Sequence, residues 1–372
     1  MPRFGLDARL AYYQQGGITQ YIYHLIRELP ALDPVGEYVI LHSRKDRRDL
    51  STAPNQRRVA CWTPAHHRLE RLALAVEVFP LRLDLLHSPD FIPPHKPGGW
   101  RSVITIHDLT FLHYPDFLTA ESRRYYNGQI EAAVRCADHI LTDSEATRLD
   151  VLNLLGVPPE KVTTVLLGLD ERFRPAPPEA IRRVREANNL PEGYLLFVGT
   201  FEPRKNLGGL LRAYARLRDA LPDAPPLVIA GRRGWLYEEV FTLGEELGLS
   251  GSLIWLEDVP HDDLPALYSG AAALCLPSFY EGFGFPPLEA MACGTPAVVS
   301  DRASLPEVVG EAALLINPDD PESLAGALRR LLTDSQLAEE LRRKGLEQAR
   351  KFDWRETARR TLAVYRRVLE GE

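Results

Sequence analysis

The sequence predicts an α/β protein made of two doubly wound, Rossmann-like domains with a ligand cleft between them. Short apolar runs alternate with longer amphipathic segments, which is the pattern of parallel strands joined by helices. The length of 372 residues exceeds one ordinary hydrophobic core and suits two domains. Residues 171–178 include the run Arg-Phe-Arg-Pro-Ala-Pro-Pro, which cannot continue a helix or a central strand. We therefore interpret this segment as a linker between a domain over residues 1–170 and one over residues 179–353.

Each predicted domain has its own series of apolar, strand-like runs. In the first half these runs are residues 4–7, 38–42, 58–62, 85–88, 103–107, 139–142 and 162–166. In the second half they are residues 194–199, 227–231, 252–256, 272–276, 297–300 and 313–316. Ligands of doubly wound sheets bind at the carboxyl ends of the strands, so the segments that follow these runs are the first places to look for a site.

Composition narrows the class of protein. Apolar content of 45% and charged content of 26% are typical of a soluble globular protein. A formal net charge of −7 argues against a nucleic-acid binder, which is usually basic. The cysteines (Cys61, Cys136, Cys275 and Cys293) form no Cys-x-x-Cys pair and suggest neither a zinc site nor a disulfide framework. With no signal-peptide pattern at the N-terminus and no apolar run long enough to span a bilayer, a cytoplasmic location is expected.

The most informative segment runs from Glu281 to Glu289 and reads Glu-Gly-Phe-Gly-Phe-Pro-Pro-Leu-Glu. It follows an apolar run and leads into a helix-like run, and a strand, a glycine-bearing loop and a helix start make an anion site. Carboxylates beside such a site suit a ligand that also offers hydroxyl groups. A nucleotide sugar has both phosphates and hydroxyls. A surface loop with one favourable N-terminal glutamate would explain Glu289 but not the remaining pattern.

Two further glycine-bearing segments have a related character. The run from Gly199 to Asn206 (Gly-Thr-Phe-Glu-Pro-Arg-Lys-Asn) also follows a predicted strand, and a lysine at such a position can reach a diphosphate. A solvated Arg-Lys pair is the plainer interpretation. The pair Gly16-Gly17 precedes an amphipathic run and allows close approach of a ligand to the backbone, although a simple strand-to-helix turn fits nearly as well.

His107 and Asp108 end the apolar run 103–107 and are predicted to lie at the carboxyl end of a buried strand. The histidine there could donate to a hydroxyl or stabilise developing charge, and a structural histidine is about equally plausible. No His-x₃-His spacing, carboxylate cluster or Asp-x-Asp pair supports a metal site, so none is predicted.

Positive charge gathers in the first half at residues 44–48, 57–58 and 66–68. Most runs of this kind are solvated surfaces. Because they lie near the apolar run 69–79, peripheral contact with an anionic membrane, on the inner face of the plasma membrane, is a further expectation.

Taken together, these segments resemble those of the retaining glycosyltransferases of family 4, which have the GT-B fold. Glu281 to Glu289 is similar to the Glu-x₇-Glu motif of that family, Gly199 to Asn206 to its diphosphate loop, and Gly16-Gly17 to its N-terminal glycine pair. Further similar stretches begin at Ile106, Asp143, Leu166 and Leu305, so the resemblance extends over nearly the whole chain. The segments around His107 and Gly199 look most like those of bacterial mannosyltransferases of surface-polysaccharide assembly.

The resemblance implies an acceptor-binding first domain, against which a C-terminal helix over about residues 354–370 packs, and a second domain that binds the nucleotide sugar. It implies that Glu289 binds the ribose hydroxyls, that Glu281 contacts the donor sugar, and that Arg204 and Lys205 neutralise the diphosphate. His107, with Asp108, would lie near the transferred sugar. The remaining donor contacts implied are those of Gly16, Gly17, Thr200, Val259, Gly282, Phe283, Gly284, Phe285 and Leu288.

The implied reaction is front-face transfer with retention, in which the leaving diphosphate helps to deprotonate the acceptor hydroxyl. It requires no cofactor and no metal, only a nucleotide-sugar co-substrate, for which GDP-mannose is the first expectation. The acceptor would be a glycan, a lipid-linked glycan or a small molecule. One position departs from the pattern, because many members of the family have an arginine where this chain has Thr200.

Three alternatives remain open from the sequence. The donor could be a UDP-sugar of glucose, galactose or N-acetylglucosamine. A nucleotide-sugar 2-epimerase of the same fold would need no acceptor, although the Glu281–Glu289 and Gly199–Asn206 segments argue for transfer. A non-catalytic binder of sugar nucleotides is the third alternative, and the intact set of His107, Lys205, Glu281 and Glu289 gives no sign of it.

Overall fold

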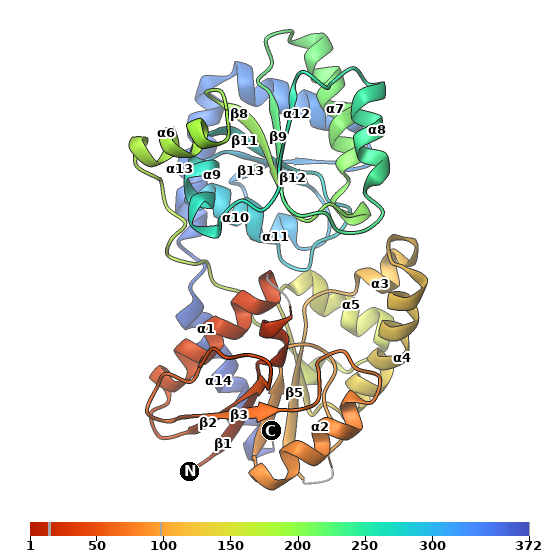
Figure 1. The fold of residues 1–372 in the computed structure, drawn as a ribbon, viewed down its shortest axis with the longest axis vertical. Coiled ribbons are helices and arrows are strands. Elements are labelled where there is room, and N and C mark those ends of the chain that lie inside the picture. The colour runs from red at the N-terminus through yellow and green to blue at the C-terminus, as the bar shows by residue number, and fades with distance from the viewer. Residues whose placement is uncertain (14–15, 97–98, 372) are drawn as a thin grey trace. The chain divides into compact units, whose positions relative to one another are not determined.

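The computed structural model describes residues 1–13, 16–96 and 99–371 (Figure 1). Its contacts divide the chain into two compact units. Unit 1 comprises Met1–Gly168 together with Asp353–Glu372, and unit 2 comprises Leu169–Phe352.

Unit 1 is built around a parallel sheet with the strand order β3-β2-β1-β4-β5-β6-β7. The strands are β1 (Arg3–Asp7), β2 (Glu37–Ser43), β3 (Gln56–Cys61), β4 (Leu85–Ser88), β5 (Arg101–Ile106), β6 (His139–Thr142) and β7 (Val162–Thr164). The helices are η1 (Arg9–Tyr12), α1 (Gly17–Leu32), α2 (Glu70–Val78), η2 (Phe79–Leu81), α3 (Thr110–His113), η3 (Pro115–Phe117), α4 (Ala120–Cys136), α5 (Glu145–Leu155), η4 (Pro159–Lys161) and α14 (Trp354–Glu370).

Unit 2 is a second parallel sheet with the strand order β10-β9-β8-β11-β12-β13. The strands are β8 (Tyr194–Val198), β9 (Leu227–Ala230), β10 (Leu253–Leu256), β11 (Ala271–Leu276), β12 (Ala297–Ser300) and β13 (Ala313–Ile316). The helices are α6 (Pro178–Ala187), η5 (Pro203–Lys205), α7 (Leu207–Ala220), α8 (Glu238–Glu246), η6 (His261–Asp263), α9 (Leu264–Ser269), α10 (Phe285–Ala292), α11 (Leu305–Val309), α12 (Pro321–Thr333) and α13 (Ser335–Ala349).

Both sheets are doubly wound, which confirms the predicted fold class. The predicted strand runs are strands in the structure, with ends that differ by one or two residues. The direction of winding reverses between β1 and β4 in unit 1 and between β8 and β11 in unit 2. Such reversal points open a crevice at the carboxyl edge of a doubly wound sheet, so they direct attention to the segments that follow these four strands.

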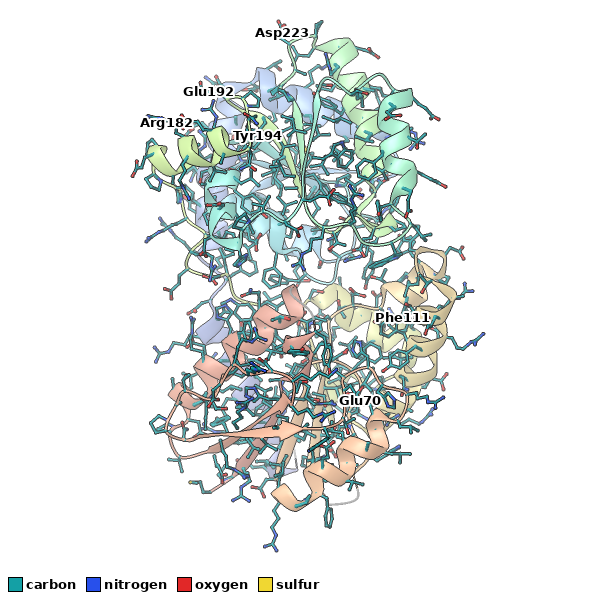
Figure 2. The ribbon with its side chains drawn as sticks, in the orientation of Figure 1. Glu70, Phe111, Arg182, Glu192, Tyr194 and Asp223 are labelled. Atoms are coloured by element: carbon teal, nitrogen blue, oxygen red, sulfur yellow. The ribbon has the colours of Figure 1, made fainter. Side chains whose placement is uncertain are left out.

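The sheet strands are apolar because both faces are covered by helices. The strand residues Ile40, Ile104, Leu196 and Leu274 are fully buried. Figure 2 shows the same contrast at its labelled residues: Tyr194 lies inside unit 2, while the charged side chains of Arg182 and Asp223 lie on its surface.

The last helix, α14, belongs to unit 1 although the chain reaches it only after completing unit 2. Its Trp354 ring stacks on His24 of α1 with the ring centroids 4.3 Å apart. Its Tyr365 hydroxyl lies 2.6 Å from Nδ1 of His87, which is a fully buried residue of β4. Because burial lowers the pKa of His87 to about 3, this imidazole is neutral and accepts or donates without carrying charge.

Candidate functional site

In unit 2, the candidate site lies where the winding of the sheet reverses, in the segments that follow β8 and β11. Two hydrogen bonds join these segments. The N–H of Phe279 donates to the carbonyl of Arg204 at 2.9 Å, and the Asn206 side chain donates to the carbonyl of Pro277 at 3.2 Å. Asn206 has a left-handed backbone and caps α7 by accepting from the N–H of Gly209. The two segments therefore form one surface rather than two separate loops.

Glu281 is the centre of this surface. Lys205 Nζ donates to its Oε1 atom at 2.7 Å, and Arg204 Nη1 donates to its Oε2 atom at 2.7 Å. Arg204 also pairs with Glu202, 2.6 Å away. Two carboxylates and two cations thus form an ionic quartet of Glu202, Arg204, Lys205 and Glu281, whose charges cancel.

The quartet is almost excluded from solvent. Glu202, Lys205 and Glu281 are each less than 10% exposed. Burial would raise the pKa of Glu281, but the charges of Arg204 and Lys205 outweigh it and lower that pKa to about 2. Glu281 is therefore ionised at every physiological pH. A new anion at this surface has to compete with Glu281 for the same two cations.

The loop from Glu281 to Gly284 is held by Ser304, whose hydroxyl lies 2.8 Å from the carbonyl of Glu281 and 2.7 Å from that of Phe283. Gly284 caps α10 with φ +112°, a conformation that favours glycine, and a Cβ atom there would lie 2.7 Å from Leu305. Pro286 and Pro287 lie in the first turn of the helix, where the missing N–H groups sacrifice no helical hydrogen bond. The glycine and the prolines fix the turn that directs the helix start toward the ionic quartet.

Glu289 lies further along α10 and has different partners. The hydroxyl of Tyr268, in α9, donates to its Oε2 atom at 2.6 Å. Burial raises the pKa of Glu289 to about 7, and the hydrogen bond from Tyr268 opposes that shift only in part. Glu289 is therefore the one of the two motif carboxylates that changes charge near neutral pH.

The other predicted donor contacts of unit 2 are placed as follows. Gly282 and Phe283 are buried in the loop, and Phe285 packs on Phe283 with ring centroids 5.2 Å apart. The Leu288 side chain is fully buried, so only its backbone could face a ligand. Thr200 is exposed after β8. Val259 follows β10, and since β9 lies between β10 and β8 in the sheet, the structure does not bring it into the ionic quartet.

In unit 1, His107 and Asp108 follow β5. His107 Nδ1 lies 2.5 Å from Oδ2 of Asp143, and its Nε2 lies 2.9 Å from the carbonyl of Pro89. Burial would lower the pKa of His107, but the charge of Asp143 outweighs it and raises that pKa to about 9. Both ring nitrogens therefore donate, and the ring is a partly buried cation rather than a base. A direct bond from this ring to a sugar would have to replace one of its protein partners.

The other residues of unit 1 that the sequence predicted are Asp108, Gly16 and Gly17. Asp108 accepts from the N–H of Thr110 at 2.9 Å, a local turn contact. Gly16 and Gly17 are exposed at the start of α1, where no side chain caps the helix. One turn later, the Tyr21 ring packs edge-on against His107, with centroids 5.4 Å apart. The helix that begins at Gly17 thus contacts the cationic ring of His107.

Several residues of the two sites were not singled out from the sequence. Glu202 lay inside a recognised segment, but nothing in its type distinguished it from a solvated glutamate. Ser304 and Tyr268 are remote in sequence from the Glu281–Glu289 motif and belong to no pattern that could have pointed to them. Within the described residues, no group of three or more His, Cys, Asp and Glu side chains is arranged to hold a metal ion. The helices described include none with both the length and the apolar character needed to cross a membrane.

Comparison with known proteins accounts for both units. Residues 180–351 match the family model described as glycosyl transferases group 1, and residues 15–173 match that of glycosyltransferase family 4. The O-antigen chain mannosyltransferase B of Escherichia coli is 31% identical over 376 residues, covering 95% of this chain and 97% of that protein.

Solved structures share the fold over the whole chain. Sucrose-phosphate synthase from Thermosynechococcus elongatus aligns with a TM-score of 0.80 at 22% identity, covering 100% of both chains. Anabaena Alr3699/HepE in complex with UDP and glucose aligns with a TM-score of 0.77 at 17% identity, covering 98% of this chain and 99% of that one. The family matches, the full-length relative and the two Rossmann-like units agree: this chain belongs to glycosyltransferase family 4 and is a hexosyltransferase of the GT-B fold.

Proposed function

We propose that this glycosyltransferase moves mannose from GDP-mannose to a glycan or lipid-linked glycan acceptor, with retention of the anomeric configuration. The observation that carries the site assignment is the ionic quartet around Glu281, which sets two cations beside the start of α10 at the reversal point of the unit 2 sheet. The donor sugar is inferred from the mannosyltransferase relative, since no residue of the quartet distinguishes one hexose from another.

In this proposal, the donor diphosphate takes over the positive charge that Glu281 holds in the nucleotide-free protein. Arg204 and Lys205 turn from the carboxylate toward the phosphate oxygens, assisted by the positive end of the α10 helix dipole. Glu281 is then released to accept hydrogen bonds from hydroxyls of the donor sugar. The same exchange neutralises the diphosphate as it leaves, so the charge that develops in the transition state meets cations already in position.

Glu289 has a separate role in the proposal. As a carboxylate it accepts hydrogen bonds from the two ribose hydroxyls, a task for which an acceptor-only group is suited. Because its pKa is about 7 in the nucleotide-free protein, binding the ribose favours loss of its proton. Tyr268 keeps one of its oxygens in place by donating to it.

In unit 1, the proposal gives the His107 imidazolium an electrostatic role toward the negative charge on the departing diphosphate. Asp143 and the Pro89 carbonyl hold the ring by both nitrogens. The acceptor hydroxyl loses its proton to the leaving diphosphate, so no side chain is required as nucleophile or as general base. Neutralisation by Arg204 and Lys205 makes a divalent metal unnecessary in this scheme.

A panel of nucleotide sugars tests the donor assignment. Calorimetric titration with GDP-mannose, UDP-glucose, UDP-galactose and UDP-N-acetylglucosamine should give one clear binder, and we expect GDP-mannose. Tight binding of a UDP-sugar in its place would move the protein to the other donor class, which the UDP-bound structural neighbour makes the principal alternative. Conversion of UDP-N-acetylglucosamine to its 2-epimer without an acceptor would overturn transfer altogether.

We also propose that unit 1 rests on an anionic membrane through a surface on and around α2. Leu69, Leu72, Val76 and Phe79 follow one another at helical spacing and are 52%, 59%, 73% and 55% exposed. Trp62, which precedes this stripe in the sequence, is 70% exposed. The guanidinium carbon of Arg44 lies 4.1 Å from the centroid of its ring. A contiguous apolar stripe with aromatic and basic neighbours is the composition of an interfacial helix, whose apolar side enters the lipid while the cations meet acidic headgroups.

A further inference from the structure

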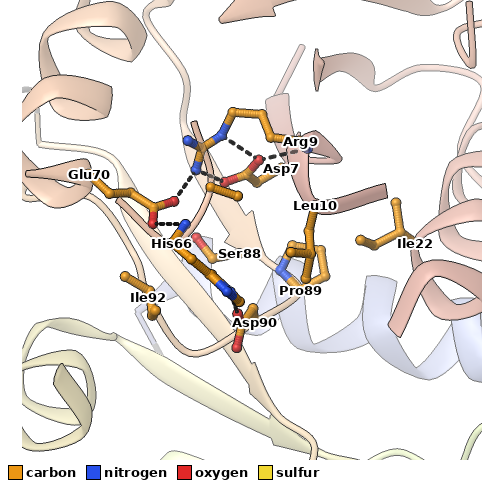
Figure 3. Close-up of a pocket in the computed structure, with 11 residues that line it drawn as sticks. Asp7, Arg9, Leu10, Ile22, His66, Glu70, Ser88, Pro89, Asp90 and Ile92 are labelled. Carbon is orange, nitrogen blue, oxygen red and sulfur yellow. Dashed lines mark hydrogen bonds and ion pairs between the residues drawn. The ribbon is translucent and has the colours of Figure 1, made fainter. Parts of the chain in front are cut away.

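Unit 1 contains a small pocket at the carboxyl ends of β1 and β4, the two strands between which its sheet reverses (Figure 3). The charged residues Asp7, Arg9, His66, Glu70 and Asp90 line it together with Ser88. Its cavity volume is about 20 Å³. That is room for roughly one water-sized group, so it could receive a single hydroxyl or hydroxymethyl group but not a sugar ring.

Arg9 lines one side of the pocket and is held there by several protein groups. The Arg9 guanidinium, 1% exposed, lies between two carboxylates. It donates to Asp7 through Nε at 2.9 Å and through Nη2 at 2.6 Å, and Nη2 also lies 2.5 Å from Oε1 of Glu70 (Figure 3). Its Nη1 atom donates to the carbonyl of Thr63 at 2.9 Å. Arg9 is thus fully engaged by the protein and is not offered to a ligand.

The opposite wall is His66, whose backbone is in the left-handed region with φ +60°. That conformation is unusual for a residue other than glycine, and here it is held from both ends of the residue. The N–H of His66 donates to Oε2 of Glu70 at 2.7 Å, and its ring Nε2 lies 2.7 Å from Oδ2 of Asp90. These two contacts hold the backbone of His66 in this conformation and orient its imidazole toward Asp90.

Two hydroxyl groups in and beside the pocket have no hydrogen-bond partner among the described residues. Ser88 is 3% exposed and lines the cavity, and its buried Oγ atom is unpartnered. The hydroxyl of Tyr125, in α4, is buried and likewise unpartnered, and its ring centroid lies 6.0 Å from that of His66. A buried hydroxyl without a partner costs stability, so a group that can both donate and accept would be favoured here.

The charges of the pocket select the chemical class of that group. Three carboxylates, those of Asp7, Glu70 and Asp90, outnumber the two cations, Arg9 and a protonated His66. Because the cations are already paired with these carboxylates, the pocket would repel a phosphate. Aromatic rings lie next to it: Tyr126 packs on Tyr125 and on Phe91, with centroid separations of 5.6 and 5.8 Å. Carboxylates, hydroxyls and aromatic rings together suit a neutral polyol.

We infer that this pocket receives a hydroxyl or hydroxymethyl group of a neutral sugar unit of the acceptor, with the Ser88 hydroxyl as its recognition group. The inference rests on the proposed function, because it supplies the acceptor class of the same reaction. Pro89 connects the two sites: its ring lines the pocket while its carbonyl accepts from His107. An acceptor anchored at Ser88 is therefore held one residue away from a direct partner of the cationic histidine. The acceptor recognised here is a glycan end rather than a sugar phosphate.

The test measures acceptor binding without any donor, so that it fails or succeeds independently of the donor assignment. Saturation-transfer NMR on the whole protein would titrate methyl α-D-mannopyranoside as the neutral probe and mannose 6-phosphate as the charged one. We expect binding of the neutral glycoside, weaker binding of the phosphate, and a several-fold rise in the glycoside Kd for Ser88→Ala.

Thermal unfolding of Ser88→Ala separates ligand recognition by Ser88 from a purely structural role. Since the Ser88 hydroxyl has no partner, Ser88→Ala should leave the midpoint of the ligand-free protein unchanged or raise it, while weakening the glycoside. Ser51→Ala is the matched control, because Ser51 also has a buried hydroxyl without a partner among the described residues but does not line this pocket. Unchanged glycoside affinity in Ser88→Ala would overturn the inference, as would tighter binding of mannose 6-phosphate or no glycoside binding by the wild-type protein. A lowered midpoint with unchanged affinity would identify the pocket as the seat of a structural water instead.

Discussion

The ammonium group of Lys205 lies 2.7 Å from Oε1 of Glu281, and both side chains are more than 90% buried. A carboxylate of the Glu281–Glu289 segment is therefore paired with a cation of the Gly199–Asn206 segment. Burying two charges is costly, and mutual pairing with a second cation, Arg204, offsets that cost. The pairing keeps all three groups charged, and under the proposed function a donor diphosphate would compete with Glu281 for the two cations.

Breaking this pair from one side should destabilise unit 2. In Lys205→Met the Glu281 carboxylate keeps Arg204 but loses the more deeply buried of its two cations, and we expect a loss of about 3 kcal/mol in the free energy of unfolding. The double variant Lys205→Met/Glu281→Gln removes both charges and should recover most of that stability, while GDP-mannose affinity stays low. Urea denaturation and calorimetry measure the two quantities. Arg343→Ala is the control, because Arg343 pairs with Glu347 on the exposed surface of α13 and such pairs contribute about 0.5 kcal/mol. Donor affinity that returns with stability would show that Lys205 has no direct part in binding.

The pKa of Glu289 predicts how donor affinity depends on pH. Its value of about 7 means that at pH 6 most of the carboxyl is protonated, whereas at pH 8 most is ionised. If the ionised form binds ribose, the affinity for GDP-mannose should rise by about tenfold from pH 6 to pH 8, one pKa unit being worth a factor of ten. The donor is a diphosphate diester with no proton to lose in this range, so the change reports on the protein. Calorimetric titration at several pH values measures it.

Two substitutions sharpen that pH experiment. Glu289→Gln should flatten the dependence at low affinity, and Tyr268→Phe should move the rise to higher pH, because it removes a hydrogen bond that opposes the raised pKa. The same pKa affects folding. A carboxyl whose folded-state pKa lies above its ordinary value stabilises the fold at acid pH, and this contribution is lost as pH rises toward 7. Glu289→Gln should therefore be more stable relative to wild type at pH 8 than at pH 5. An unchanged pH profile in Tyr268→Phe would contradict the assignment.

Glu281 and Glu289 show which features of the site can be predicted from the sequence and which cannot. The order of the motifs, the strands and the fold class could all be read because apolar runs and turn residues report local structure directly. The sequence led to different proposed roles for Glu281 and Glu289, but the partners that distinguish them, Arg204 with Lys205 and Tyr268, come together only through the fold. Long-range pairing also decides pKa values, since it sets burial and nearby charge, and neither is encoded in a local pattern. The Ser88 pocket lies beyond such reading for the same reason: its residues come from five separate segments.

The hydrogen bonds of the Ser304 hydroxyl lead to a prediction that no sequence motif suggested. Ser304→Ala removes the hydroxyl that holds the carbonyls of Glu281 and Phe283, which should cost about 1–2 kcal/mol of stability. It should also weaken donor binding, because the loop that presents Glu281 loses its fixed position. Hydrogen exchange of the amides of residues 281–284 should accelerate while that of the β8 strand does not. Ser304→Thr, which keeps a hydroxyl, is the matched control, and equally fast exchange in both variants would point to packing rather than to the hydrogen bonds.

The raised pKa of His107 predicts a decline of activity in alkali. Its value of about 9 means that the ring carries its charge at pH 7.5 and loses it as pH rises through 9. The turnover number should fall across that range, and the stability that the charged ring contributes, which is complete below its ordinary pKa near 6.5, should decline over the same interval. Asp143→Asn removes the charge that raises the pKa, so its activity should decline at lower pH. His107→Asn should lower the turnover number by about 100-fold, within the range of a single electrostatic contact, with donor affinity nearly unchanged. A pH profile that Asp143→Asn leaves unaltered would exclude the cationic role.

The exposed stripe on α2 predicts binding to acidic vesicles. Replacing Leu72 and Val76, which are 59% and 73% exposed, with glutamate should not disturb the core, because neither side chain is part of it. It should abolish sedimentation of the protein with vesicles that contain phosphatidylglycerol, since two charges would have to enter the lipid interface. Arg44→Ala should weaken binding less and reduce its sensitivity to salt, as each basic residue near an anionic surface contributes about 1 kcal/mol. Leu149→Glu and Leu154→Glu on α5, also about half exposed, form the matched control pair. Equal vesicle binding by the α2 and α5 double variants would show that the stripe is not the membrane contact, and transfer to a water-soluble acceptor should be the same in all of them.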